Sequence, residues 1–207
     1  MKNETIVALF TALRKDNPNP KGELYSETPF QHLVAVVLSA QSTDAGVNRV
    51  TPALFAAAPT AYDMVQLGEE GIRDHIRSLG LFNSKARHLF ALSHILNERY
   101  RGEVPDDRAI LESLPGVGRK TANVVLNVCF GHPTLAVDTH VFRLARRTGL
   151  AQGKTPEAVE KILLQKIPQE FLRHAHHWLI LHGRRVCAAR KPACHHCLIA
   201  PWCEKHL

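Results

Sequence analysis

The sequence has few of the features that mark strands, membrane spans and secretory signals. Aromatic residues make up 6% of its 207 residues, and no Asn-Gly or Asp-Gly pair is present to form a tight hairpin turn. No apolar run reaches the roughly 18 residues that a membrane span needs. The first residues, MKNETIVALF, contain no long apolar stretch leading to a small-residue cleavage site. We therefore expect no signal peptide, no membrane partner and a cytoplasmic location.

Apolar residues, in contrast, make up 45% of the chain, which is enough for a substantial core, and they recur mostly at helical spacing. The pattern indicates an all-α protein. Asn83 or Ser84 is a plausible cap for the helix that begins there, and Thr155 precedes a proline that suits a first helical turn. The predicted helices span about residues 4–15, 29–41, 69–79, 84–100, 107–114, 118–130, 139–148, 156–167 and 169–183.

Positive charge is concentrated in the last third of the chain. Residues 1–137 hold 14 Lys and Arg against 14 Asp and Glu, whereas residues 138–207 hold 12 against 5, which accounts for the whole net charge of +7. This asymmetry indicates a surface that faces a polyanion. A solvated basic face would have the same composition, so charge alone does not decide between the two.

Five cysteines are present, and four of them cluster near the C-terminus with the spacing C-x6-C-x2-C-x5-C. In a reducing compartment, clustered cysteines hold metal more often than they form disulfides. Four thiolates satisfy either a tetrahedral zinc ion or an iron–sulfur cubane, although zinc modules usually have two short Cys pairs and this segment has one. The fifth, Cys129, lies in an apolar helix and is expected in the core. The four candidate metal ligands are Cys187, Cys194, Cys197 and Cys203.

The segment LPGVGRKTANVVLN, residues 114–127, is the most informative part of the chain. It predicts a helix, a turn in which Gly116 and Gly118 flank Val117, and a second helix. Both glycines allow backbone angles closed to other residues and a close approach by a ligand. Amides at the start of a helix favour an anion, so the turn suits a nucleic-acid phosphate. An ordinary helical hairpin with glycines for tight packing is the alternative.

Lys120 falls in the first turn of that second helix, and Asp138 follows after a short loop. A lysine with an ordinary pKa near 10.4 is protonated at pH 7, but burial and the positive end of a helix both lower the pKa. The neutral amine would attack a sugar carbon, and a carboxylate opposite would stabilise the developing charge or accept a proton. A phosphate-neutralising lysine and a helix N-cap are the alternative roles of these two residues.

The sequence resembles the endonuclease III family of DNA base-excision repair glycosylases in these motifs, in the terminal cysteines and over most of the chain between them. The resemblance implies a two-lobed helix-hairpin-helix glycosylase fold, with the hairpin at about 107–130 and a C-terminal [4Fe-4S] cluster loop at 187–203. Residues 22–132 would form one domain, residues 1–21 and 133–207 the iron–sulfur domain, and DNA would lie in the cleft between them.

The same resemblance implies the activity and the partner. The enzyme would be a bifunctional glycosylase that removes oxidised pyrimidines from double-stranded DNA and cleaves abasic sites by β-elimination. Lys120 would be the nucleophile that forms a Schiff base, and Asp138 the catalytic carboxylate opposite it. We expect a monomer that associates with the nucleoid through DNA. The resemblance also favours iron–sulfur over zinc at the four cysteines.

An enzyme that acts beneath a base must extrude the nucleotide and fill the gap. From residue chemistry alone, Leu81 would pack back on its own helix and Gln41 would be a polar helix end. The resemblance implies instead that Leu81 intercalates and Gln41 fills the gap. Further DNA contacts are expected from the hairpin, at Gly116, Val117, Gly118 and Arg119, and from the cluster loop, at Arg190 and Lys191.

Three other functions are compatible with part of the sequence. A monofunctional adenine glycosylase of the same superfamily typically lacks the lysine and carries an extra C-terminal domain. A non-catalytic DNA-binding module with a structural metal would bind abasic DNA without cutting it. An iron–sulfur electron carrier would leave the hairpin and Lys120 unexplained.

Overall fold

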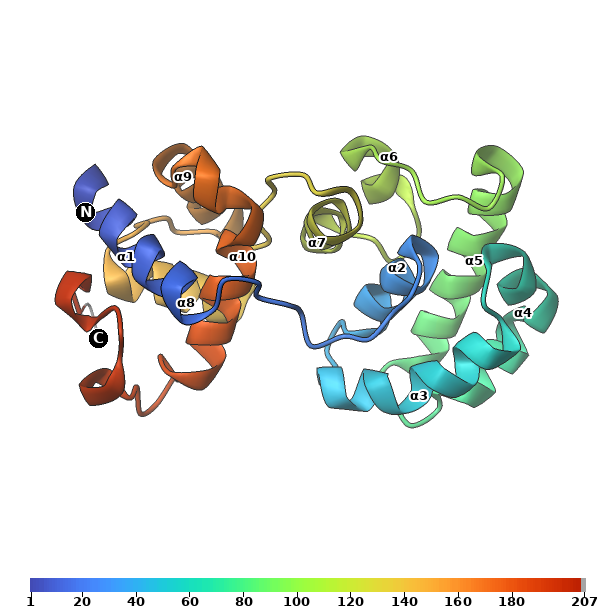
Figure 1. Ribbon diagram of the computed structural model, residues 1–207. Helices are drawn as coiled ribbons and strands as arrows, with labels where there is room; N and C mark the ends of the chain where they lie inside the picture. Colours follow the sequence, from blue (N-terminus) through green and yellow to red (C-terminus); the bar gives the residue numbers. More distant parts are fainter. Residues whose placement is uncertain (206–207) are drawn as a thin grey trace. The chain divides into compact units, whose positions relative to one another are not determined.

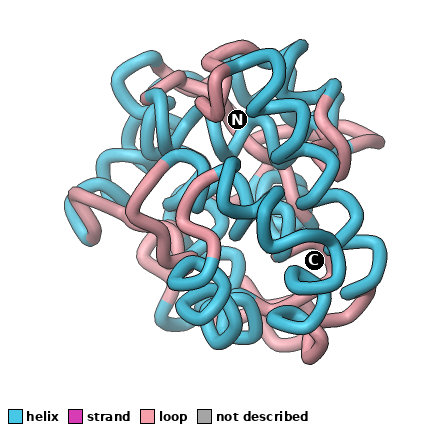
Figure 2. Tube along the Cα trace, turned by 90° about the vertical axis from the view of Figure 1, so that its right-hand side faces the viewer, coloured by secondary structure: helices cyan, strands magenta, loops and turns pink. Residues whose placement is uncertain are grey.

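The computed structural model of the protein describes residues 1–205. Over this range the chain forms helices and connecting loops and no strand (Figures 1 and 2), so the all-α prediction is confirmed. The chain divides into two compact units, which we call the hairpin unit, residues 22–130, and the cysteine unit, residues 1–21 and from 131 onward. No helix among residues 1–205 is long and apolar enough to cross a membrane.

The hairpin unit is built around a helix that is buried on all sides. In α2, Pro29–Leu38, every side chain from Phe30 onward is buried, because the sequence FQHLVAVVL is nearly all apolar. Thr28 caps its start by accepting a hydrogen bond from the Gln31 amide, and the predicted helix over 29–41 ends at residue 38 and continues as a turn. Packed against it are α3 (Asp44–Ala57), α5 (Phe82–Tyr100) and α7 (Arg119–Phe130). Helix α4 (Ala61–Ile76) packs on α3 and α5, and α6 (Arg108–Ser113) packs on α7.

Helix α3 and the first half of α4 were not predicted from the sequence. Pro52 lies inside α3 and Gly46 near its start, and both residues weaken a helical pattern. The helix forms because its apolar side chains pack on the core, where Val47, Val50 and Leu54 are buried. The predicted helix at 69–79 begins where α4 is kinked by Gly68, whose φ is 73°.

Other helix boundaries were predicted more closely. Asp107 caps α6 by accepting a hydrogen bond of 2.9 Å from the Ile110 amide. The cap of α5 is Leu81 rather than Asn83 or Ser84, so that prediction was wrong. Cys129 packs against the core as expected, and burial raises the pKa of its thiol to about 11.

In the cysteine unit, the two ends of the chain pack together. Phe10 of α1 (Asn3–Asp16) stacks on Phe171 of α10 (Gln169–Arg185) with 5.6 Å between ring centroids, and Trp178 donates a hydrogen bond of 2.8 Å to the Asn17 carbonyl. The unit also contains α8 (Thr139–Thr148), α9 (Pro156–Lys166) and two short 3-10 helices, η1 (Cys194–His196) and η2 (Ala200–Trp202). Its core therefore depends on residues more than 150 positions apart in the sequence.

Candidate active site and cysteine loop

The turn between α6 and α7 depends on only one of its two glycines for its backbone shape. Gly116 has a φ of 78°, and a Cβ at this position would lie 3.0 Å from the Cβ and ring of His88 on α5. Gly118 has no positive φ, and a Cβ there would meet nothing within 4 Å. The prediction that both glycines adopt special backbone angles was therefore wrong for Gly118, which leaves close approach by a ligand as its remaining use.

The hairpin presents a polar edge to solvent. Val117 is buried beneath it, and its amide donates to the Leu114 carbonyl at 3.1 Å. Arg119 and Lys120 follow in the first turn of α7, and both side chains are exposed. The expectation that the protein buries Lys120 was wrong, because the first turn of a helix that follows an open turn projects away from the core.

Asp138 is the N-cap of α8. Its Oδ1 accepts hydrogen bonds of 2.9 Å from the His140 amide and 2.8 Å from the Val141 amide, and the side chain is half-buried. The two hydrogen bonds satisfy amides at the start of α8 that have no partner within the helix. The capping role considered from the sequence is thus present, and it holds one carboxylate oxygen in a fixed position.

Gln41 and Leu81 lie in neighbouring turns of the hairpin unit. Both have left-handed backbones, with φ of 53° and 59°, and the Gln41 carbonyl is 3.7 Å from the position of a Cβ on Gly80. Leu81 is 56% exposed, so it does not pack back on its own helix as residue chemistry alone suggested. Left-handed conformations cost a non-glycine residue about 1–3 kcal/mol and persist where the surroundings enforce them. An exposed leucine on such a backbone is poorly explained by stability.

All four clustered cysteines line a single cavity beneath the end of α8. The cavity is also lined by apolar groups such as Leu144 and Ile199 and by His182. No group of three or more His, Cys, Asp or Glu side chains in residues 1–205 is arranged to hold a single metal ion. Burial is the main cause of a raised pKa at Cys197 and Cys203.

Two donors and one histidine ring nitrogen lie close to the cysteine sulfurs. Nη1 of Arg147 lies 3.7 Å from the Cys187 sulfur, the Lys205 amide lies 3.4 Å from the Cys203 sulfur, and His182 Nε2 lies 3.3 Å from the Cys197 sulfur. Thiolates that carry negative charge in a partly buried cavity need such donors. The residues present therefore fit a [4Fe-4S] cluster held by four thiolates.

Two arginines of α8 anchor the loop that carries these cysteines. Arg143 donates to the Cys187 carbonyl at 3.0 Å and to the Gly183 carbonyl at 2.6 Å. Arg147 donates to the carbonyls of Ala188 and Ala189 at 2.8 and 2.7 Å. This role was not predicted from the sequence, although two arginines four residues apart on one helix face could have indicated it.

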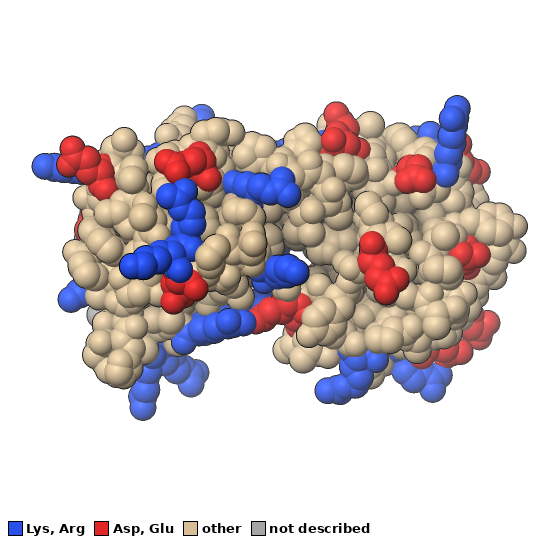
Figure 3. All heavy atoms as spheres, in the orientation of Figure 1, with Lys and Arg blue, Asp and Glu red and all other residues tan. Residues whose placement is uncertain are grey.

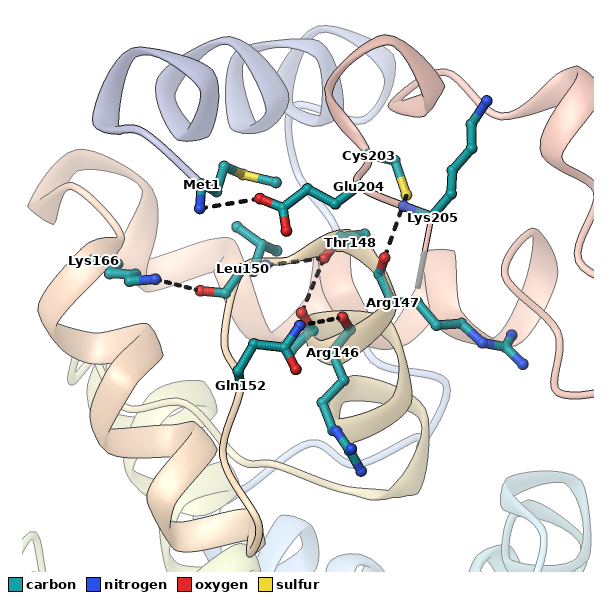
Figure 4. A network of polar contacts seen from close by, with 11 residues as sticks. Met1, Arg146, Arg147, Thr148, Leu150, Gln152, Lys166, Cys203, Glu204 and Lys205 are labelled. Carbon is teal, nitrogen blue, oxygen red and sulfur yellow. Dashed lines mark hydrogen bonds and ion pairs between the residues drawn. The ribbon is translucent and has the colours of Figure 1, made fainter. Parts of the chain in front are cut away.

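The end of the loop is tied to the same helix. Figure 4 shows the residues around Thr148 and Leu150 meeting the segment that follows η2. The Glu204 amide donates to the Thr148 carbonyl at 3.1 Å, and its carboxylate lies 3.1 Å from the Met1 ammonium group. Arg190 and Lys191, the predicted phosphate contacts, are exposed on the loop between the first two cysteines.

The excess positive charge belongs to one unit. The cysteine unit contains 16 Lys and Arg against 7 Asp and Glu, whereas the hairpin unit contains 10 against 12. Figure 3 shows Lys and Arg side chains over the face of the unit that holds α1 and α8–α10. The net positive charge of the protein therefore originates in the cysteine unit.

Comparison with known proteins assigns this arrangement to a class. Residues 34–169 match the model of the HhH-GPD superfamily of base excision DNA repair proteins. The chain is 55% identical to endonuclease III of Rickettsia conorii over 204 residues, which are 99% of this chain and 97% of that protein. It is 54% identical to endonuclease III of Escherichia coli K12 over 196 residues, 95% of this chain and 93% of that protein.

Solved structures agree with this assignment. The fold matches a trapped covalent intermediate of endonuclease III with DNA at a TM-score of 0.92 and 43% identity, covering 99% of this chain and 97% of that one. A thermostable thymine-DNA glycosylase, 22% identical, shares the fold at a TM-score of 0.86. The chain belongs to the endonuclease III family of the HhH-GPD superfamily, and it is a base-excision repair DNA glycosylase and abasic-site lyase.

Proposed function

We propose that this enzyme removes oxidised pyrimidines from double-stranded DNA and cleaves the resulting abasic site through a Schiff base on Lys120. The observation that carries the proposal is the exposed primary amine in the first turn of α7, directly after the Gly116–Gly118 turn. A relative of the same fold has been captured as a covalent intermediate with DNA, which requires a nucleophile.

The reaction proceeds in steps that balance. The neutral amine of Lys120 attacks C1′ of the damaged nucleotide, the base leaves with its bonding electrons and takes up a proton, and the amine forms an iminium with the opened sugar. Loss of a proton from C2′ then expels the 3′ phosphate by β-elimination, and water releases the lysine. Asp138 is the carboxylate that stabilises positive charge on the sugar and accepts the amine proton.

In this proposal the two capping hydrogen bonds to Asp138 also shape its chemistry. Its Oδ1 is occupied by the amides of His140 and Val141, so the carboxylate keeps one orientation through the reaction. A carboxylate oriented in advance costs no reorganisation when charge develops. Replacing Asp138 by Asn would retain a cap and lose the negative charge, which separates the structural role from the chemical one.

In this proposal, the protein binds the DNA backbone at two places. The hairpin binds a phosphate at a contact formed by Gly116, Val117, Gly118 and Arg119. The amide of Val117 is not one of the donors, because it already donates to the Leu114 carbonyl. Arg190 and Lys191 of the cysteine loop bind a second stretch of backbone. Removing both loop charges by Arg190→Gln and Lys191→Gln should lower the magnitude of the log Kd against log salt slope by about 2. An unchanged slope would exclude these two contacts.

Opening of the DNA duplex is assigned to Leu81 and Gln41. An exposed leucine on a turn fits between base pairs, and the amide of Gln41 offers a donor and an acceptor to the base left unpaired. Their neighbouring turns place both side chains on the same part of the hairpin unit. We further propose that the enzyme acts as a monomer in the cytoplasm, bound to the nucleoid through DNA.

The four cysteines are proposed to hold a [4Fe-4S] cluster through Cys187, Cys194, Cys197 and Cys203. When bound, the cluster would supply a rigid cross-link of the loop. The protein's own residues then present Arg190 and Lys191 to the DNA backbone. One zinc ion per chain in the purified protein would contradict this proposal.

Borohydride trapping tests the assignment of Lys120. Wild-type enzyme and abasic duplex DNA should give a covalent complex on reduction, and Lys120→Gln should abolish it. Lys161→Gln, at an exposed lysine of α9, is the matched control and should trap at the wild-type yield. Trapping of Lys120→Gln at the wild-type yield would exclude Lys120 as the nucleophile.

A further inference from the structure

Lys85 is a buried lysine that the proposed chemistry does not use. It lies in the first turns of α5, and the residue is 4% exposed. Its Nζ donates a hydrogen bond of 2.7 Å to the Ser42 hydroxyl, although the two residues are 43 positions apart. Burial lowers the pKa of this amine. Because lysine can usually extend its charged end into water, enclosure of the whole side chain indicates that its position is enforced.

The backbone and the side chain of Lys85 each form a hydrogen bond with one of the two segments that are assigned to opening the DNA duplex. Its backbone amide donates to the Leu81 carbonyl at 3.0 Å, the first hydrogen bond of α5. Its ammonium group reaches Ser42, the residue directly after Gln41. One residue therefore joins the turn that carries Leu81 to the turn that carries Gln41.

Both turns need such support, because both residues have left-handed backbones that leucine and glutamine rarely adopt. Local hydrogen bonds such as Ser42 N to the Ser39 carbonyl shape the first turn, but they do not relate it to the second. The hydrogen bond from Lys85 to Ser42 connects the start of α5 to the turn after α2.

We propose that Lys85 is a positioning residue that holds Leu81 and Gln41 in the single relative geometry needed to enter a DNA helix around an extruded nucleotide. This inference rests on the proposed roles of those two residues. A buried ion is a weak source of stability, since an apolar side chain of similar volume would usually serve as well. The contribution of Lys85 should therefore appear in the step that opens duplex DNA more than in folding.

The test compares a substrate that has to be opened with one that is already open. The first is a duplex containing thymine glycol, and the second is a single-stranded abasic oligonucleotide. In Lys85→Met, kcat/KM on the duplex should fall about 10-fold, because small misplacements of positioning groups are costly, while single-strand lyase activity stays within about 2-fold. Fluorescence of 2-aminopurine beside the lesion should report the same deficit in extrusion.

Further variants test whether loss of the hydrogen bond between Lys85 and Ser42 causes the defect on duplex DNA. Ser42→Ala removes the same hydrogen bond and should reproduce the defect, and combining it with Lys85→Met should add nothing further. Arg99→Met removes a positive charge from the exposed far end of α5, about 20 Å away along the helix, and should leave both activities unchanged.

The outcomes separate this inference from the proposed function. Wild-type enzyme that processes neither substrate would refute the proposed function, whereas an active wild type with an equally active Lys85→Met would refute the positioning role alone. An equal loss on both substrates would also refute it, because a general structural defect does not distinguish open from closed DNA. If Lys85→Met does not fold, Ser42→Ala provides the same comparison, and wild-type duplex activity in that variant overturns the inference.

Discussion

His88 on α5 packs against Gly116 in the turn before α7, so closely that a Cβ at Gly116 would lie 3.0 Å from the His88 ring. The contact fixes the hairpin against the same helix that begins at Leu81. Because Gly116 also has a positive φ and Gly118 has neither constraint, the two glycines of the hairpin should respond differently to substitution.

Gly116→Ala should destabilise the protein by about 1–3 kcal/mol, because it combines a disfavoured backbone with overpacking against His88. Gly118→Ala should leave the free energy of unfolding within about 0.5 kcal/mol of wild type, and yet weaken binding to duplex DNA by holding the phosphate away from the amides. Urea unfolding and DNA titration measure the two effects. Equal destabilisation by both substitutions would contradict the structural difference.

Leu81→Ala should reduce turnover of a lesion-containing duplex by about 10-fold and leave thermal stability nearly unchanged, because the side chain is 56% exposed and little buried area is lost. Leu89→Ala, a substitution of the same chemistry at a fully buried site on the same helix, should instead lower stability by about 3–5 kcal/mol. Wild-type turnover by Leu81→Ala would exclude the intercalating role.

Arg147→Met should release the start of the cysteine loop, because the guanidinium binds the carbonyls of Ala188 and Ala189. Charged hydrogen bonds of this kind contribute about 1.5–3 kcal/mol each. With the proposed cluster bound, loss of iron in the presence of a chelator should therefore be at least about 10-fold faster in this variant than in the wild type. Arg146→Met is the matched control, since Arg146 is exposed and lies over the Phe142 ring. The same iron-loss rate in both variants would show that the loop does not depend on Arg147.

His177 should make the protein less stable in mild acid. Burial, and secondarily the charge of His174, lowers its pKa to about 4, from an ordinary value of 6.5. The unfolded chain then binds a proton that the folded chain does not, so stability is complete above pH 6.5 and falls as the pH drops toward 4. The loss between pH 7 and pH 5 should be about 2 kcal/mol.

Urea unfolding at several pH values checks this expectation. His177→Phe should flatten the decline between pH 7 and pH 5 by about 2 kcal/mol, because the buried titrating group is gone. His94→Phe, at an exposed position of α5, should keep the wild-type decline. An equally steep decline in both variants would assign the acid sensitivity to other groups.

Local sequence features predicted most of the helices because caps and apolar spacing act within a few residues. Thr155 marks the start of a helix where expected, because its hydroxyl accepts a hydrogen bond from the Ala158 amide. The same local signals failed for α3, where Pro52 obscures a helix that tertiary packing stabilises. They also failed for Leu81, because whether an apolar side chain turns inward depends on the left-handed backbone at that position.

The sequence by itself determined the all-α fold, the hairpin motif, the spacing of the four cysteines and the family, because each depends on residue type at short range or on likeness along the chain. Only the tertiary structure decided that Lys120 is exposed, that Gly116 and Gly118 differ, and that Lys85 reaches Ser42. The last two facts depend on contacts between residues that are 28 and 43 positions apart in the sequence, and no local sequence pattern encodes such contacts.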